Sequence, residues 1–163
     1  MQIERIGTVR AALGECPVWD ATRGRIWMAD CRAGQILAVD PDSGAARHWQ
    51  LPAPLGSFAF NGDDELVVAL KERFALFNTS DHALRTVAHI GDSHPNLRLN
   101  DGVAMPDGSF VAGTMHIHRQ EGEPPRGGLY RLDTQGRLSR IAQGLGVVNG
   151  PAPDPTGTYF HVC

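Results

Sequence analysis

Three oxygen-bearing side chains stand at matching places in a repeated sequence pattern. Glu15, Asn100 and Asn149 each precede a β-type run by ten or eleven positions, whereas the second repeat has Gly56 at this place. Taken singly, each of the three would be typical of an ordinary turn or exposed loop, but the shared offset favours a common role. Carboxylate and amide oxygens are hard ligands that suit Ca²⁺, Mg²⁺ or Mn²⁺. The spacing therefore predicts a divalent cation site to which several repeats contribute.

A second group of polar residues surrounds Asn100. Arg98 lies two positions before it, so on a β-strand the two side chains would share a face. An arginine beside amide and carboxylate oxygens suits a polyhydroxylated substrate, because it offers several N–H donors in fixed geometry. The alternative role for Arg98 is a surface ion pair. Asp101 would point elsewhere on a regular strand unless a turn re-aims it, and it is a candidate general base.

Two histidines offer a different chemistry. His116 and His118 are two positions apart and could share one face of a strand. Structural zinc sites usually have four ligands, and the sequence shows no further partners for this pair. We therefore interpret both histidines as loop residues.

The candidate site needs a fold that brings distant repeats together. Short β-type runs follow turn signals, and convincing helical periodicity is absent. Each unit has the order strand, turn, strand, loop, strand, turn, strand within roughly 40–50 residues, which is typical of a propeller blade. A β-sandwich with frequent turns is the alternative. The corresponding runs of successive units are residues 24–30, 64–70, 108–114 and 157–163.

We predict an all-β fold consisting of an incomplete β-propeller with about three and a half blades. The partial domain would cover residues 1–163, with approximate blades at 13–54, 55–97 and 98–146 and the start of a fourth at 147–163. The first strand of each blade lines the central channel of a propeller. This arrangement would aim Glu15, Asn100 and Asn149 at the axis.

Composition narrows the classes of partner. The net charge of -3 gives no electrostatic reason to expect binding to nucleic acid or an anionic membrane. No apolar run approaches the roughly 20 residues of a membrane span, and residues 1–5 lack a signal-peptide pattern. The 3 cysteines form a sparse set without metal-type spacing. Reduced thiols and a cytoplasmic location are therefore expected.

Four segments resemble the N-terminal half of the SMP-30/gluconolactonase/regucalcin-like sugar lactonases, and the likeness runs over nearly the whole chain. The resemblance implies a six-bladed propeller with one divalent metal ion on its axis, which could be Ca, Zn, Mg, Mn or Fe. It also implies a small-molecule sugar lactone as substrate. The resembling segments are residues 13–19, 98–102 continuing through 112–115, 127–132 and 149–152.

The resemblance also assigns roles to individual residues. Glu15 and Asn149 match metal ligands, whereas Arg98 and Asn100 match the pair that contacts the substrate. Asp101 matches a residue beside them and is the candidate catalytic group.

Two family features have no clear counterpart in this sequence. The family has a substrate-contacting glutamate after a Gly-Thr-Met motif, for which Glu121 is the candidate here and Glu123 the alternative. A third metal ligand, an aspartate of a later blade, is expected beyond Cys163. Residues 153–157 also depart from the family's usual turn sequence, although the spacing is retained.

The sequence thus predicts metal-dependent hydrolysis of an aldonolactone by the full-length protein, as in gluconolactonases. One alternative is a non-catalytic propeller that binds calcium or sugar. Another is an inactive fragment of a lactonase, because an incomplete propeller leaves open blade edges through which the chain could self-associate.

Overall fold

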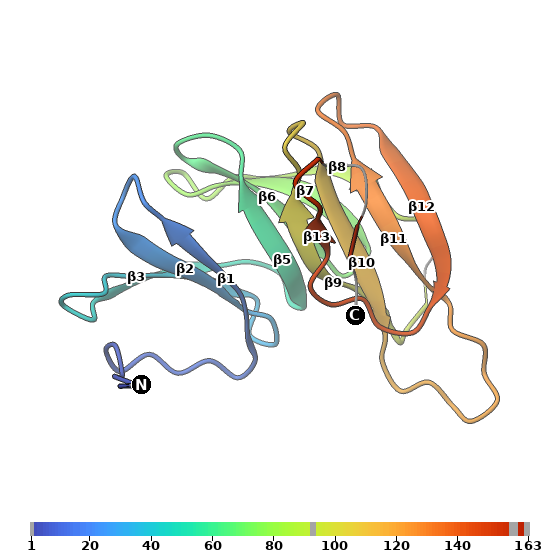
Figure 1. Ribbon diagram of the computed structural model, residues 1–163, viewed down its shortest axis with the longest axis horizontal. Helices are drawn as coiled ribbons and strands as arrows, with labels where there is room; N and C mark the ends of the chain where they lie inside the picture. The colour runs from blue at the N-terminus through green and yellow to red at the C-terminus, as the bar shows by residue number, and fades with distance from the viewer. Residues whose placement is uncertain (1, 92–93, 157–159, 162–163) are drawn as a thin grey trace.

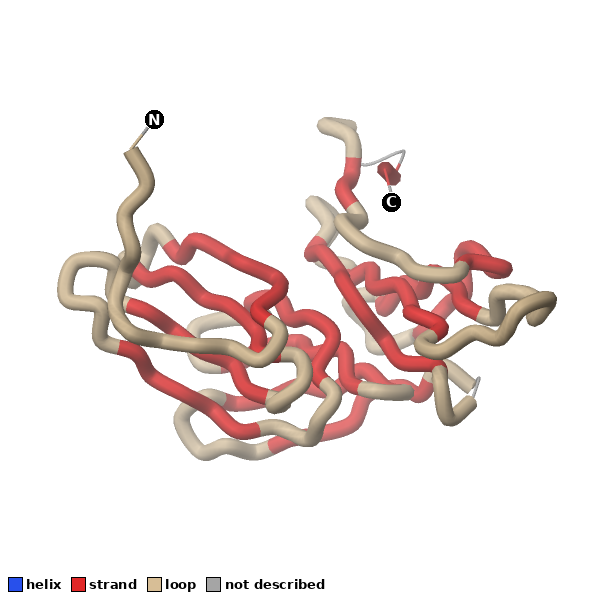
Figure 2. The backbone as a smooth tube through the Cα atoms, turned by 90° about the horizontal axis from the view of Figure 1, so that it is seen from below, coloured by secondary structure: helices blue, strands red, loops and turns tan. Residues whose placement is uncertain are grey.

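The computed structural model describes residues 2–91, 94–156 and 160–161. Its strands form 4-stranded antiparallel sheets that follow one another along the chain, and a short 2-stranded pair near the C-terminus (Figure 1). Figure 2 shows strands joined by loops and turns throughout the described part. Within these ranges no helix has the length and apolar character needed to cross a bilayer. The prediction of an all-β fold is confirmed.

Each large sheet keeps the order of the chain, and every strand pairs with the next one. The first sheet contains β1 (Gly14–Asp20), β2 (Arg25–Asp30), β3 (Gln35–Val39) and β4 (Ala46–Gln50). The second contains β5 (Leu55–Phe60), β6 (Glu65–Leu70), β7 (Arg73–Asn78) and β8 (Leu84–His89). The third contains β9 (Leu97–Ala104), β10 (Phe110–His116), β11 (Gly127–Leu132) and β12 (Leu138–Leu145), and β13 (Ala152–Pro153) pairs with β14 (Phe160–His161).

The expected run at 108–114 is displaced towards the C-terminus. The observed strand begins at Phe110, because the preceding turn continues through Ser109, whose backbone N–H and hydroxyl both donate to the Asp107 carboxylate. The strand then continues to His116, beyond the predicted end. Of the run expected at 157–163, residues 157–159 and 162–163 lie outside the described residues.

The sheets pack face to face through apolar side chains. Trp27 of β2 stacks on Trp49 of β4 with 4.9 Å between ring centroids, and both belong to the cluster that joins the first and second sheets. The indole N–H of Trp49 donates to the Thr79 carbonyl at 2.8 Å, which links the same two sheets. A second cluster, which includes Phe74 and Phe110, joins the second and third sheets.

The inner strands of neighbouring sheets lie side by side, with β5 packed directly against β9. Gly56 stands at this contact, and a Cβ there would lie 2.5 Å from the carbonyl oxygen of Asn100. The next residue, Ser57, donates its hydroxyl to that same oxygen at 2.9 Å. The second repeat therefore has glycine where the other repeats have a polar residue, because β9 lies too close to β5 at this position for a side chain to fit.

We expect Gly56→Ala to lower the free energy of unfolding by about 1–3 kcal/mol, since an added methyl group must displace the backbone of β9. The matched control is Gly146→Ala, because a Cβ at Gly146 would have its nearest neighbour at 3.7 Å. Denaturant unfolding of both variants measures the difference. Equal stability of the two variants would show that β5 and β9 are not held this closely.

Candidate functional site

Glu15 lies in β1, next to an irregularity in the strand. The pairing of β1 with β2 shifts register between Glu15 and Val18, and Cys16 has a positive φ of 51°. Glu15 is exposed, and it lines a pocket of about 470 Å³ together with Asp101 and Pro151. The local bulge thus places the carboxylate of the first sheet on the same pocket wall as residues of the third sheet and the segment that follows it.

Asn100 and Asn149 are in direct contact. The side-chain amide of Asn100 donates to the Asn149 side-chain oxygen at 2.8 Å and to the Val148 carbonyl at 2.8 Å. Asn100 is buried, whereas Asn149 is exposed. Because an amide nitrogen carries two hydrogens, both donors of Asn100 are used and its amide oxygen remains available as an acceptor. The bond also orients the Asn149 side chain.

Asp101 connects β9 to the segment that carries Asn149. One carboxylate oxygen accepts the backbone N–H of Gly150 at 2.7 Å, and the other accepts that of Gly102 at 2.9 Å. Asp101 is therefore a positioning residue in this structure, and it also lines the pocket that contains Glu15. Its role as a general base stays a prediction.

Arg98 is buried rather than part of a surface ion pair. Its guanidinium donates to the Leu99 carbonyl at 3.0 Å and to the Met115 sulfur at 3.4 Å. Burial lowers the pKa of Arg98, while the nearby Cys31 and Glu15 act in the opposite direction. Arg98 lines a second pocket, of about 350 Å³, whose other walls include Cys31 and Met115.

Two cysteines lie close to these pockets. Burial raises the pKa of Cys16 to about 11 and that of Cys31 to about 12. The raised pKa values disfavour a free thiolate at either position when no metal is bound. Glu15 and Asn149 offer oxygen atoms to a cation.

Asp30 holds the segment that leads into β1. One of its carboxylate oxygens accepts the N–H of Ala12 at 2.7 Å, and the other accepts those of Leu13 and Ala33, each at 3.2 Å. Burial alone would raise the pKa of Asp30, but these backbone donors outweigh it and lower the pKa below its usual value. The ionised carboxylate thus fixes the approach to Glu15.

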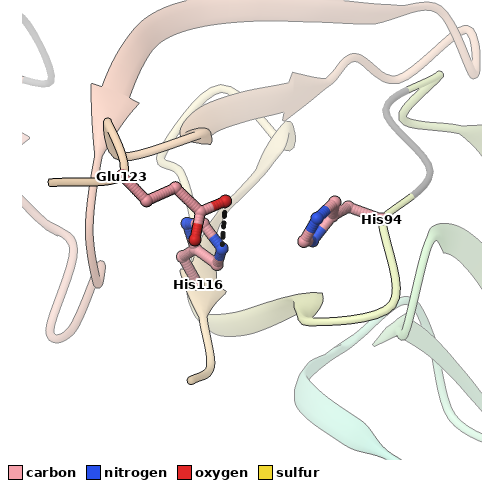
Figure 3. A group of neighbouring side chains, drawn as sticks. All are labelled: His94, His116 and Glu123. Carbon is pink, nitrogen blue, oxygen red and sulfur yellow. Dashed lines mark ion pairs between the residues drawn. The ribbon is translucent and has the colours of Figure 1, made fainter. Parts of the chain in front are cut away.

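A separate cluster joins His94, His116 and Glu123 (Figure 3). The Nε2 atom of His116 lies 3.6 Å from a carboxylate oxygen of Glu123, and the two imidazole rings have centroids 5.3 Å apart. The Gln120 N–H, with smaller contributions from His116 and Arg126, lowers the pKa of Glu123.

The interpretation of His116 as a loop residue is wrong. Its side chain is buried at the end of β10, and its partners are His94 and Glu123 rather than His118, which is exposed in the following turn. Repeat spacing in the sequence did not identify this cluster. His94 and Glu123 lie in the two longer loops, which have no counterpart in the other repeats. Glu121 is exposed and is not among the residues lining the Arg98 pocket, so its substrate contact stays a prediction.

The chain is similar in sequence to one family of known proteins. The family model described as "SMP-30/Gluconolactonase/LRE-like region" matches residues 13–163. A 6-deoxy-6-sulfogluconolactonase from Pseudomonas putida is 32% identical over 151 residues, which cover 93% of this chain and 51% of the relative. Regucalcin from Gallus gallus is 32% identical over 134 residues, which cover 81% of this chain and 45% of the relative.

Solved structures show the same fold. The crystal structure of a calcium-binding protein, regucalcin, from Agrobacterium tumefaciens strain C58 superimposes with a TM-score of 0.83 at 23% identity. The match covers 95% of this chain and 51% of that structure. The chain spans about half the length of the curated relatives it matches. The predicted propeller fold is confirmed by this similarity.

Asp30→Asn should lower the free energy of unfolding at pH 7 by about 1–3 kcal/mol, because three part-buried backbone donors lose a carboxylate acceptor. The lowered pKa of Asp30 means that its contribution is complete above the ordinary carboxyl pKa of about 4 and is lost as the pH falls below it. Unfolding measured from pH 7 to pH 2.5 should therefore show the gap between wild type and variant narrowing below about pH 4. The exposed Asp42→Asn is the control; a gap that does not change with pH would contradict this role.

Proposed function

Because the chain belongs to the SMP-30/gluconolactonase/LRE-like family, we propose that its site serves metal-dependent hydrolysis of a sugar lactone of the aldonolactone class. The observation that carries the proposal is the contact between Asn100 and Asn149. This contact lies beside the pocket that Glu15 and Asp101 line. The contact joins the third sheet to the following segment, and the pocket adds Glu15 of the first sheet.

The donor atoms fit a hard divalent cation. Glu15 offers a carboxylate and Asn149 an amide oxygen, both exposed, while Asn100 holds the orientation of Asn149. Such oxygens favour Ca²⁺, Mg²⁺ or Mn²⁺ over Zn²⁺ or Fe²⁺. Two protein ligands leave further coordination positions for water, substrate or additional protein oxygens. When bound, the cation would supply Lewis acidity, polarising the lactone carbonyl and stabilising its developing negative charge.

Arg98 would orient the sugar. Its guanidinium is fixed by the Leu99 carbonyl and the Met115 sulfur, and an arginine has five N–H donors in total. The remaining donors would contact hydroxyl groups of a substrate bound between Arg98 and Glu15, whose charges lie close enough to interact. The geometry of a planar guanidinium suits recognition of neighbouring oxygens on one sugar ring.

Asp101 would act as general base. Its two backbone hydrogen bonds fix the carboxylate, and each oxygen retains a further lone pair. A water molecule would transfer a proton to Asp101 while its oxygen attacks the lactone carbonyl carbon. Cleavage of the ring ester bond would then return the proton to the departing ring oxygen, giving the open-chain hydroxy acid.

A non-catalytic calcium- or sugar-binding function is the second candidate. It is favoured by the relatives named regucalcin and by the use of both Asp101 oxygens in backbone hydrogen bonds. Under this alternative Asp101 would only position the segment around Asn149.

A cytoplasmic location and self-association through sheet edges are further proposals. The first rests on cysteine usage, and the second rests on open strand edges.

Hydrolysis of D-glucono-1,5-lactone with and without EDTA tests the proposal. We expect enzymatic turnover to disappear with EDTA and to return on adding Ca²⁺ or Mn²⁺. Glu15→Gln and Asn149→Ala should each lower kcat/KM by more than about 100-fold, because even outer-shell partners of a metal contribute about 10–100-fold. The exposed Glu4→Gln is the control. Turnover that is indifferent to EDTA would eliminate the metal from the mechanism.

Asp101→Asn separates the two candidate functions. If Asp101 is the base, kcat should fall by about 10²–10⁴-fold while Ca²⁺ affinity, measured by calorimetry, changes little. Parallel losses of turnover and Ca²⁺ affinity would instead assign Asp101 to positioning alone. Tight Ca²⁺ binding by a wild-type protein that hydrolyses no lactone would favour the non-catalytic alternative.

A further inference from the structure

We propose that His94, His116 and Glu123 form a second metal site, suited to Zn²⁺ or a similar transition-metal ion. The three come from the loop between β8 and β9, the end of β10, and the loop between β10 and β11 (Figure 3). One ligand atom from each lies within 4.8 Å of the others. This set shares no residue with the oxygen ligands proposed for the lactone site.

The state of His116 is the independent observation that points to a ligand. Its side chain is buried, and neither ring nitrogen has a hydrogen-bond partner among the described residues. Burying a polar group without a partner is energetically unfavourable, and such groups are rare in folded proteins. Figure 3 shows the His116 ring beside the Glu123 carboxylate, with the His94 ring to the right of both. A metal bound there would satisfy a nitrogen that the protein leaves unpaired.

The distances are close to those of a tetrahedral site. Zinc–nitrogen bonds of about 2.0–2.1 Å place neighbouring tetrahedral ligands about 3.3 Å apart. His116 Nε2 and the Glu123 carboxylate are 3.6 Å apart, and the three ligand atoms all lie within 4.8 Å of one another. Contraction by about 1–1.5 Å would complete the geometry. His94 and Glu123 are partly exposed on loops and can make this movement, whereas His116 is fixed at the strand end.

The chemistry distinguishes this site from the one at Glu15 and Asn149. Two imidazoles and one carboxylate, with a fourth position open to water, are a familiar zinc ligand set. Imidazole nitrogens suit Zn²⁺, Co²⁺, Ni²⁺ or Cu²⁺, whereas a carboxylate with an amide oxygen suits Ca²⁺ or Mg²⁺. The two sites should therefore select different ions.

Contacts around Glu123 support its orientation. One carboxylate oxygen accepts the N–H of Gln120 at 3.1 Å, and the other, which faces His116, accepts from Arg126 at 3.4 Å. Such outer contacts commonly orient metal-ligating carboxylates. The competing arrangement is an ion pair between a protonated His116 and Glu123 without a metal.

A metal here would tie the loop between β10 and β11 to the chain before β9. The two neighbours of His116, Met115 and Ile117, line the pocket that contains Arg98. The N–H of Ile117 also donates to the Asn96 carbonyl, so the two loops already touch. Metal binding would fix the rim of that pocket.

Titration of the 163-residue chain with Co²⁺ tests the site directly, because tetrahedral Co²⁺ gives stronger visible absorption than octahedral Co²⁺. We expect one tetrahedral Co²⁺ per chain, displaced by Zn²⁺ but retained in excess Ca²⁺. His94→Ala and Glu123→Gln should each weaken binding at least tenfold, and both side chains are exposed enough for the fold to persist. His118→Ala and Glu121→Gln, in the same loop, should bind like the wild type. Glu15→Gln should also retain the Co²⁺ signal, which separates this site from the proposed lactone site.

Limited proteolysis supplies a second readout. Trypsin cleavage after Arg119 and Arg126, which are exposed in the loop, should slow on adding Zn²⁺ to the wild type but not to Glu123→Gln. Co²⁺ binding that is unchanged in His94→Ala and Glu123→Gln would overturn the proposal. A folded wild type without tetrahedral Co²⁺ would overturn it as well, leaving the His116–Glu123 ion pair as the role of these residues.

Discussion

The approach of β5 to β9 at Gly56 is the constraint on which the candidate site depends. With no side chain between them, the two backbones lie close enough for Ser57 to bond the carbonyl oxygen of Asn100. Gly113 permits a similar approach on the next strand, since a Cβ there would lie 2.2 Å from the Val148 side chain. The first contact holds β9 against β5, and the second seats Val148 against β10. They bring the segment after β12 to Asn100, so that the inner edges of several sheets meet.

The polar residues at this junction use their hydrogen bonds to hold one another before any ligand arrives. Asn100 donates both amide hydrogens to the segment that contains Asn149, and one Asp101 oxygen accepts the N–H of Gly150. What remains for a ligand is a set of oxygen atoms, and burial raises the pKa of the neighbouring cysteine thiols. The imidazoles lie elsewhere, at the end of β10 and in the adjoining loops. The fold thus keeps the imidazole nitrogens apart from the oxygen donors of Glu15 and Asn149.

Local sequence signals predicted most of the strand order, because each blade repeats its own turns and spacing. Glu15, Asn100 and Asn149 could be matched by offset alone. The function of Gly56 could not be predicted in this way, since the atom that excludes a side chain belongs to β9, more than forty residues later. The partners of His116 were missed for the same reason: they lie in non-repeating loops, whose spacing carries no information about contact. The backbone bonds of Asp101 are likewise non-local.

Paramagnetic broadening by Mn²⁺ is the most direct test of the central claim that Glu15, Asn100 and Asn149 surround one cation. Substoichiometric Mn²⁺ added to the isotope-labelled protein should broaden the amide resonances of all three residues together. Resonances in the outer strands should remain sharp, and Glu15→Gln should abolish the effect. Broadening of only one of the three, or broadening centred on outer strands, would contradict a shared ion at the inner edges of the sheets.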